Sequence, residues 1–272
     1  MISGLSRRLV TAGVVLPFLA LAIYGGPRWL ALVLALLAVC GARELVRIHR
    51  AKGPATSAWL PAAGAVLLIA SQARLIPIGL PAALVAITVS AMVVELFRRH
   101  GSMLAGFPLV LLASIYVGLL PAYILRFYDL GGGGGSSPWP VYWVLILIFA
   151  CDTAAYVVGS NFGRHKLWPR VSPSKSWEGS IAGVITSVVL AAVLTRMVPG
   201  LSLLSRVVAG LLVGVFAQIG DLGESLMKRE AAMKDSGTTF PGHGGVLDRL
   251  DSVVLAVPIL YYWLLWSLRA KG

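Results

Sequence analysis

The sequence predicts an all-α integral membrane protein, built as a polytopic bundle of helices. Hydrophobic residues make up 58% of the 272 residues and charged residues only 12%, and the mean hydropathy is +0.85. Soluble domains usually contain about 45–50% apolar residues. Apolar runs long enough to cross a hydrocarbon core, about 20 residues each, recur along almost the full chain. We therefore expect a single membrane-embedded domain over residues 1–272.

About nine apolar segments are candidate transmembrane helices, separated by polar links or by links that contain Gly and Pro. The second segment is the shortest. Their expected ranges are 9–26, 29–42, 56–73, 75–97, 103–125, 141–159, 181–198, 206–227 and 252–268.

The basic residues are distributed unevenly over these links. If the N-terminus is cytoplasmic, sixteen of the 23 Lys and Arg residues lie on the cytoplasmic side and the remaining seven on the other side. Lys and Arg favour cytoplasmic loops, so this imbalance supports that orientation. It also explains the net charge of +12 without a nucleic-acid partner. The two long polar links, residues 160–180 and 225–251, then share the cytoplasmic face.

Three acidic residues, Asp152, Asp221 and Glu224, lie inside apolar segments. Such residues are energetically costly in a membrane and usually face a bundle interior or a water-filled cavity. Asp221 and Glu224 share a helix face with Gln218, Ser225 and Lys228, because these residues recur at three- and four-residue intervals. The alternative is that these side chains only form hydrogen bonds between helices, and for Asp152 both interpretations stay open.

Residues 225–251, SLMKREAAMKDSGTTFPGHGGVLDRLD, combine acidic and basic side chains next to the last apolar segment. The carboxylates are hard oxygen ligands of the kind that magnesium prefers, and basic side chains are suited to phosphate oxygens. Together they indicate a site for a metal-bound polyphosphate. The acidic residues are Asp235, Asp248 and Asp251, and the basic residues are Lys228, Arg229, Lys234 and Arg249.

Two further features point to an anion. Gly244 and Gly245, beside His243, would let backbone N–H groups approach a phosphate closely. A helix is expected to begin near SKSWEGS, where free N–H groups and Lys175 could hold an anion. The alternatives are a salt-bridged cytoplasmic loop for the first feature and contact with acidic lipid headgroups for the second.

The motifs S-L-M-K-R, K-D-S-G and F-P-G-H-G-G-V-L-D-R-L-D resemble the signature of the phosphatidate cytidylyltransferase family, also called CDP-diacylglycerol synthases. The segments CDTAAYVVGSNFGRHK and SPSKSWEG are also similar to blocks of that family. The resemblance covers the second half of the chain, whereas the first half matches only in hydropathy. It implies a scaffold in residues 1–130 and a catalytic site in residues 141–272.

The resemblance implies that CTP and phosphatidic acid react, with magnesium required, to give CDP-diacylglycerol and pyrophosphate at the cytoplasmic face. A second cation and a homodimer are compatible with it. Another enzyme, a CTP-dependent lipid kinase or a polyprenyl-phosphate phosphotransferase, remains an alternative, and so does a transporter. The implied catalytic residues are Asp221, Lys234, Asp248, Arg249 and Asp251, and three of them, Asp221, Asp248 and Asp251, are expected to bind metal. The implied substrate-binding residues are Lys175, Ser225, Lys228, Arg229, His243, Gly244 and Gly245. Second-rank candidates are Asp152, Glu224 and Asp235.

Overall fold

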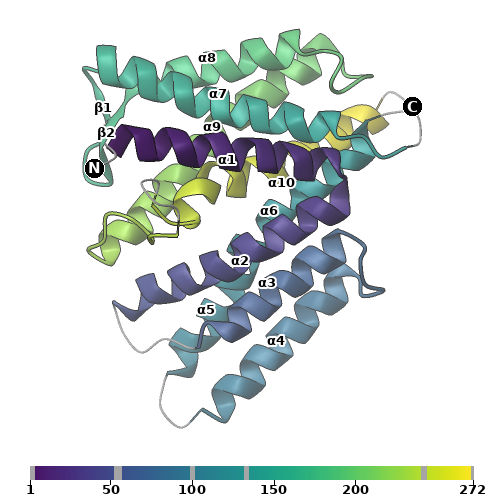
Figure 1. Ribbon diagram of the computed structural model, residues 1–272, viewed down its shortest axis with the longest axis vertical. Helices are drawn as coiled ribbons and strands as arrows, with labels where there is room; N and C mark the ends of the chain where they lie inside the picture. Colours follow the sequence, from purple (N-terminus) through teal and green to yellow (C-terminus); the bar gives the residue numbers. More distant parts are fainter. Residues whose placement is uncertain (1–3, 52–56, 99–101, 132–134, 240–243, 271–272) are drawn as a thin grey trace. The chain divides into compact units, whose positions relative to one another are not determined.

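Helices make up most of the protein, as a computed structural model shows (Figure 1). The structure describes residues 4–51, 57–98, 102–131, 135–239 and 244–270, with side chains from Gly13 onward. The helices are α1 (Gly4–Tyr24), α2 (Pro27–Arg50), α3 (Trp59–Gln72), α4 (Leu80–Leu96), α5 (Met103–Ser114), the π-helix η1 (Ile115–Leu119), α6 (Leu120–Ala122), the 3₁₀ helix η2 (Tyr123–Leu130), α7 (Trp139–Phe162), α8 (Trp177–Val193), α9 (Leu203–Glu230) and α10 (Leu247–Arg269).

The predicted fold class is confirmed, because each of the nine expected segments coincides with helical structure. Within the described residues, five helical stretches are long and apolar enough to cross a membrane: Pro27–Arg50, Met103–Leu130, Trp139–Phe162, Leu203–Glu230 and Leu247–Arg269. Four shorter apolar helices occupy the other expected segments: Gly13–Tyr24, Trp59–Gln72, Leu80–Leu96 and Trp177–Val193. The chain is an all-α membrane protein.

Helix boundaries differ most from expectation in α2, which was predicted over 29–42 and extends to Arg50. Hydropathy falls after residue 42 because charged residues begin, but the helix continues as an amphipathic one. Arg43 and Arg47 lie on its exposed side, whereas Glu44 is buried with 6% exposure. The extra turns bring a carboxylate into the interior.

The polar link at residues 160–180 contains the β-strands within the described residues. Strand β1 (Lys166–Trp168) pairs antiparallel with β2 (Ser172–Ser176), and Lys166 lies opposite Ser176. Helix α8 begins directly after β2, and the Oγ of Ser176 accepts a hydrogen bond from the Gly179 N–H at 3.2 Å. This N-cap confirms the helix start expected near SKSWEGS. The hairpin itself was not predicted, because apolar and polar residues do not alternate clearly enough in this link to indicate strands.

The chain forms two compact units. The first unit contains residues 1–125 and 227–250, and the second contains residues 126–226 and 251–272. Helices α9 and α10 therefore contribute residues to both units. The expected functional division between residues 1–130 and 141–272 stays a prediction, and the boundaries of the compact units are different.

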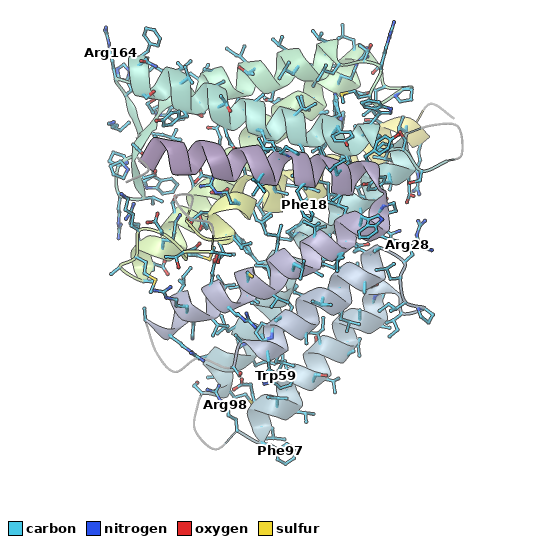
Figure 2. The ribbon with its side chains drawn as sticks, viewed as in Figure 1. Phe18, Arg28, Trp59, Phe97, Arg98 and Arg164 are labelled. Carbon is cyan, nitrogen blue, oxygen red and sulfur yellow. The ribbon has the colours of Figure 1, made fainter. Side chains whose placement is uncertain are left out.

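In the first unit, α3 packs between α2 and α4, and α5 packs on both α3 and α4 (Figure 1). Small residues with no exposure, among them Ala38, Ala65 and Ala113, let these helices lie close together. Figure 2 shows Phe97 and Arg98 just beyond the C-terminal end of α4. Arg98 forms an ion pair with Glu95 at 3.1 Å.

In the second unit, α7 and α8 lie side by side (Figure 1), and the hairpin between them contacts both helices. Trp143 and Leu147 of α7 are fully buried. On α8, by contrast, several apolar side chains are exposed. Four of them, at four-residue intervals, form one stripe: Ile181, Ile185, Val189 and Val193. A stripe of this kind is typical of a helix that faces lipid.

Candidate active site

A group of three acidic residues lies in the second unit, where α9 and α10 are in contact. Asp221 and Glu224 come from α9 and Asp251 from α10, and ligand oxygens of all three lie within 4.8 Å of one another. Glu224 is completely buried. The structure thus brings together two of the carboxylates predicted to bind metal, Asp221 and Asp251. Glu224, a second-rank candidate, completes the group.

Close approach of α9 and α10 creates this acidic group. Gly220 precedes Asp221, and a Cβ atom at Gly220 would overlap the backbone carbonyl oxygen of Asp251. Three residues before Asp221, Gln218 anchors α9 to α8. Its Nε2 donates to the Ser180 carbonyl at 3.1 Å, and the Ser180 hydroxyl donates to its Oε1. Gln218, a member of the predicted polar stripe, therefore joins α9 to α8 within the second unit.

A basic side chain accompanies the acidic group. The Nζ of Lys175, on strand β2, lies 2.7 Å from the Oδ2 of Asp221, and these side chains are 23% and 32% exposed. The hydroxyl of Ser225 donates to the other oxygen of Asp221 at 3.5 Å, the outer limit for a hydrogen bond. Asp152 lies on α7 of the same unit. Lys175 and Ser225 thus adjoin the acidic group in the second unit.

In the first unit, Lys228 and Asp248 form a mostly buried ion pair. The Nζ of Lys228 lies 2.5 Å from the Oδ1 of Asp248, and the side chains are 13% and 10% exposed. The Oδ2 of Asp248 accepts hydrogen bonds from the N–H and hydroxyl of Ser236 and from the N–H of Gly245, at 3.1, 2.9 and 2.7 Å. Asp248 therefore acts as the partner of Lys228 and of this loop, and it is not a member of the acidic group found in the described residues.

A second buried carboxylate in the first unit was missed by the sequence analysis. Glu44 of α2 accepts hydrogen bonds from the hydroxyls of Ser236 and Thr239 and from the backbone N–H groups of Val246 and Leu247. The available signal was an acidic residue between two arginines, at the point where the apolar run of α2 ends. The motifs that carry the resemblance lie in the second half of the chain and therefore imply no role for Glu44.

The other predicted residues lie in or beside the connection from α9 to α10. Arg229, Lys234, Asp235 and Arg249 are exposed. Gly244 has a φ of 82°, which favours glycine, while the N–H of Gly245 binds Asp248. His243 lies outside the described residues. In this arrangement the neighbouring amides of the loop bind the chain's own carboxylates, so their assignment to a phosphate stays a prediction.

The acidic group fits a divalent cation chemically. It brings three carboxyl groups together beside one lysine. Carboxylate oxygens are the hard ligands that Mg²⁺ and Ca²⁺ prefer. Lysine and arginine side chains near such a site are suited to the phosphate oxygens of a metal-bound nucleotide.

Comparison with known proteins agrees with this chemistry. A family model described as "Cytidylyltransferase family" matches residues 6–267. A phosphatidate cytidylyltransferase of a Synechocystis species is 34% identical, over 95% of this chain and 96% of the relative. The enzyme of the same name from Bacillus subtilis is 38% identical over 57% of each chain, and that from Haemophilus influenzae is 45% identical over 44% of each chain.

The last two alignments cover about half of each relative, whereas the family model and the Synechocystis protein match almost the full chain. The family match and the full-length relative confirm the resemblance inferred from the motifs of residues 225–251. The protein is therefore a member of the cytidylyltransferase family.

Proposed function

We propose that the protein is a phosphatidate cytidylyltransferase, which transfers CMP from CTP to phosphatidic acid and releases pyrophosphate. The observation that carries this proposal is the group of Asp221, Glu224 and Asp251 with Lys175 beside it. An acidic group with an adjacent lysine suits a metal-bound triphosphate better than it suits an uncharged substrate. The names of the relatives supply the substrate class.

The reaction needs no nucleophilic side chain. An oxygen of the lipid phosphate forms a bond to the α-phosphorus of CTP, and the bond from that phosphorus to the bridging oxygen of the β-phosphate breaks. The electron pair of the broken bond leaves with pyrophosphate. The nucleophile is already an anion, so the protein's task is to bring two anions together in line and to neutralise their charge.

Asp221, Glu224 and Asp251 would hold Mg²⁺. When bound, the metal neutralises charge on the phosphate oxygens and orients them. The ammonium group of Lys175 adds positive charge at Asp221, from which it can also reach a phosphate oxygen. Asp152 of α7, in the same unit, would be a further acidic side chain available to this site.

The basic residues of the first unit are assigned to phosphate groups. Lys228 is held by Asp248, which fixes the position of its ammonium group. Arg229, Lys234 and Arg249 are exposed and supply additional positive charge for the triphosphate or the lipid phosphate. CTP is a cytoplasmic nucleotide and phosphatidic acid lies in the leaflet, so we place the reaction at the cytoplasmic membrane surface, as the distribution of basic residues indicates.

The test is release of pyrophosphate by the purified, detergent-solubilised protein with CTP, phosphatidic acid and magnesium. Each component is omitted in turn, and ATP replaces CTP in a parallel reaction. The proposal requires that release depends on all three and that a CDP-lipid forms. Formation of CDP would instead identify a CTP-dependent kinase. Lack of turnover in a folded sample, over several lipid phosphates, would contradict the proposal.

A further inference from the structure

We propose that Glu44 is a positioning residue, which anchors the connection between α9 and α10 and thereby fixes Asp248 and Lys228. The anchoring is a structural claim about the first unit alone. Its consequence for catalysis rests on the proposed function. Glu44 lies far away in the sequence, on α2.

Four donors surround the Glu44 carboxylate. Its Oε1 accepts from the Thr239 hydroxyl at 2.6 Å and from the Val246 N–H at 3.0 Å. Its Oε2 accepts from the Ser236 hydroxyl at 3.1 Å and from the Leu247 N–H at 3.0 Å. The donors come from residues 236–239 and from residues 246–247, so one carboxylate binds both of these stretches of the connection.

Burial makes these contacts energetically important. Glu44 is 6% exposed, Ser236 is 1% exposed, and Val246 and Leu247 are fully buried. A buried carboxylate is strongly destabilising unless its oxygens are hydrogen bonded. Here two of its donors are backbone N–H groups at the start of α10, where the helix dipole also favours negative charge. The site therefore favours a charged glutamate over a neutral side chain of equal size.

The contacts continue from Glu44 to Lys228. The hydroxyl of Ser236 lies 3.1 Å from Glu44 and 2.9 Å from Asp248, and its single proton can be donated to one carboxylate at a time. Asp248 in turn lies 2.5 Å from the Nζ of Lys228. A displacement of the loop that carries Ser236 would therefore change the position of Asp248 and of the ammonium group that it holds.

The small size of Gly245 is explained by the same carboxylate. A Cβ atom at Gly245 would collide with the Ser236 hydroxyl and with the carboxylate of Glu44. The loop thus has the space for a carboxylate that comes from α2. This geometry indicates that the loop and Glu44 form one structural unit.

The first test is hydrogen exchange of the full-length protein in detergent, for the wild type and for Glu44→Gln. The amide variant keeps the size but has a single acceptor oxygen, so it cannot satisfy all four donors. We expect exchange at the Val246 and Leu247 amides to accelerate at least about tenfold, because hydrogen bonds to a charged group are lost. The matched control is Glu95→Gln, another carboxylate of the first unit with 6% exposure, which pairs with Arg98 outside this loop.

The second test is steady-state kinetics of cytidylyl transfer with the same variants. Glu44→Gln is expected to lower kcat by about tenfold to a hundredfold, the range typical of residues that orient catalytic groups, with the KM for CTP changed by less than about threefold. Glu44→Asp keeps the charge and should restore part of kcat. Ser236→Ala should lower kcat while the Val246 and Leu247 amides stay protected, because they still donate to Glu44.

Each test can contradict a different part of the proposal. Unchanged exchange at Val246 and Leu247 in Glu44→Gln overturns the anchor, whatever the activity. Equal losses of kcat in Glu44→Gln and Glu95→Gln overturn the positioning role and indicate a general effect on folding. Wild-type protein without cytidylyl transfer refutes the proposed function, while hydrogen exchange still decides whether Glu44 anchors the loop.

Discussion

The ammonium group of Lys175 lies 2.7 Å from the Oδ2 of Asp221, although the two residues belong to a β-hairpin and to a long helix. The hairpin thus places the ammonium group of Lys175 beside the acidic group that contains Asp221. Lys175 and a bound metal ion would compete for the same oxygen, and both would attract phosphate. This relationship leads to the first prediction.

Replacing Lys175 by Met should lower kcat and, at the same time, lower the magnesium concentration needed for half-maximal activity. The loss of a cation close to Asp221 strengthens the attraction of the acidic group for Mg²⁺. It also removes a charge that would stabilise the transition state, an effect of about a hundredfold. Magnesium titrations of activity provide the measurement. Lys166→Met, an exposed lysine of the partner strand, is the control, and an equal effect of both variants would argue against a specific role.

Asp221→Asn should abolish turnover without preventing folding. The neutral amide weakens metal binding, so addition of magnesium should raise the Tm of the wild type but leave the Tm of the variant nearly unchanged. Thermal unfolding in detergent with EDTA and with a magnesium series measures this difference. If the variant kept near-normal activity, the metal assignment of Asp221 would be wrong.

Gly220→Ala should destabilise the second unit and reduce activity. The added Cβ would collide with the backbone carbonyl oxygen of Asp251 and would push α9 away from α10, at a cost of about 1–3 kcal/mol. Gly223→Ala on the same helix is the matched control, because among the described residues nothing beyond the adjacent backbone of α9 lies within 4 Å of a Cβ at that position. Alanine favours helix over glycine by about 1 kcal/mol, so the control should be neutral or stabilising. Thermal unfolding and turnover are measured for both variants. Equal Tm values and equal turnover in Gly220→Ala and Gly223→Ala would refute the close contact between α9 and α10.

Breaking the pair of Lys228 and Asp248 from either side should destabilise the first unit. Each side chain is at most 13% exposed, and the partner left behind would be a buried, uncompensated charge, which typically costs about 3 kcal/mol. Both Lys228→Met and Asp248→Asn should also abolish turnover. The double variant should be less unstable than the sum of the single variants, as a double-mutant cycle of thermal unfolding would reveal. Strict additivity would show that the pair is not coupled.

Ser176→Ala should destabilise α8 by about 1 kcal/mol, because the Gly179 N–H loses its capping oxygen. Ser176→Thr should retain most of the stability, since threonine also caps helices. Ser174→Ala, at an exposed position of the same strand, serves as the control. A Tm of Ser176→Ala equal to that of the control would mean that the cap contributes little in the membrane protein.

Much of the fold could be predicted from the sequence, because hydropathy is a local property that adds up along a helix. The all-α membrane class and the helical nature of the nine apolar segments were predicted in this way and are confirmed by the structure. The helix start expected near SKSWEGS is confirmed as well. The motifs of residues 225–251 were also sufficient to predict the family. The ends of helices were less predictable, as α2 shows, because an amphipathic helix continues where hydropathy falls.

The composition of the acidic group was decided by the tertiary structure. The resemblance implied that Asp248 binds metal together with Asp221 and Asp251, but the contacts of Asp248 are with Lys228, Ser236 and Gly245. Glu224 instead joins Asp221 and Asp251. Spacing along one helix gives the direction of a side chain, but it does not determine which residues of another helix it meets.

The sequence by itself thus determined the membrane class and the family. Only the tertiary structure decided that Lys175 reaches Asp221 and that Glu44 binds a loop about 200 residues further along the chain. The physical reason is that apolar periodicity and motifs are local, whereas a buried charge requires partners. Those partners can come from any part of the chain that the packing of helices brings near.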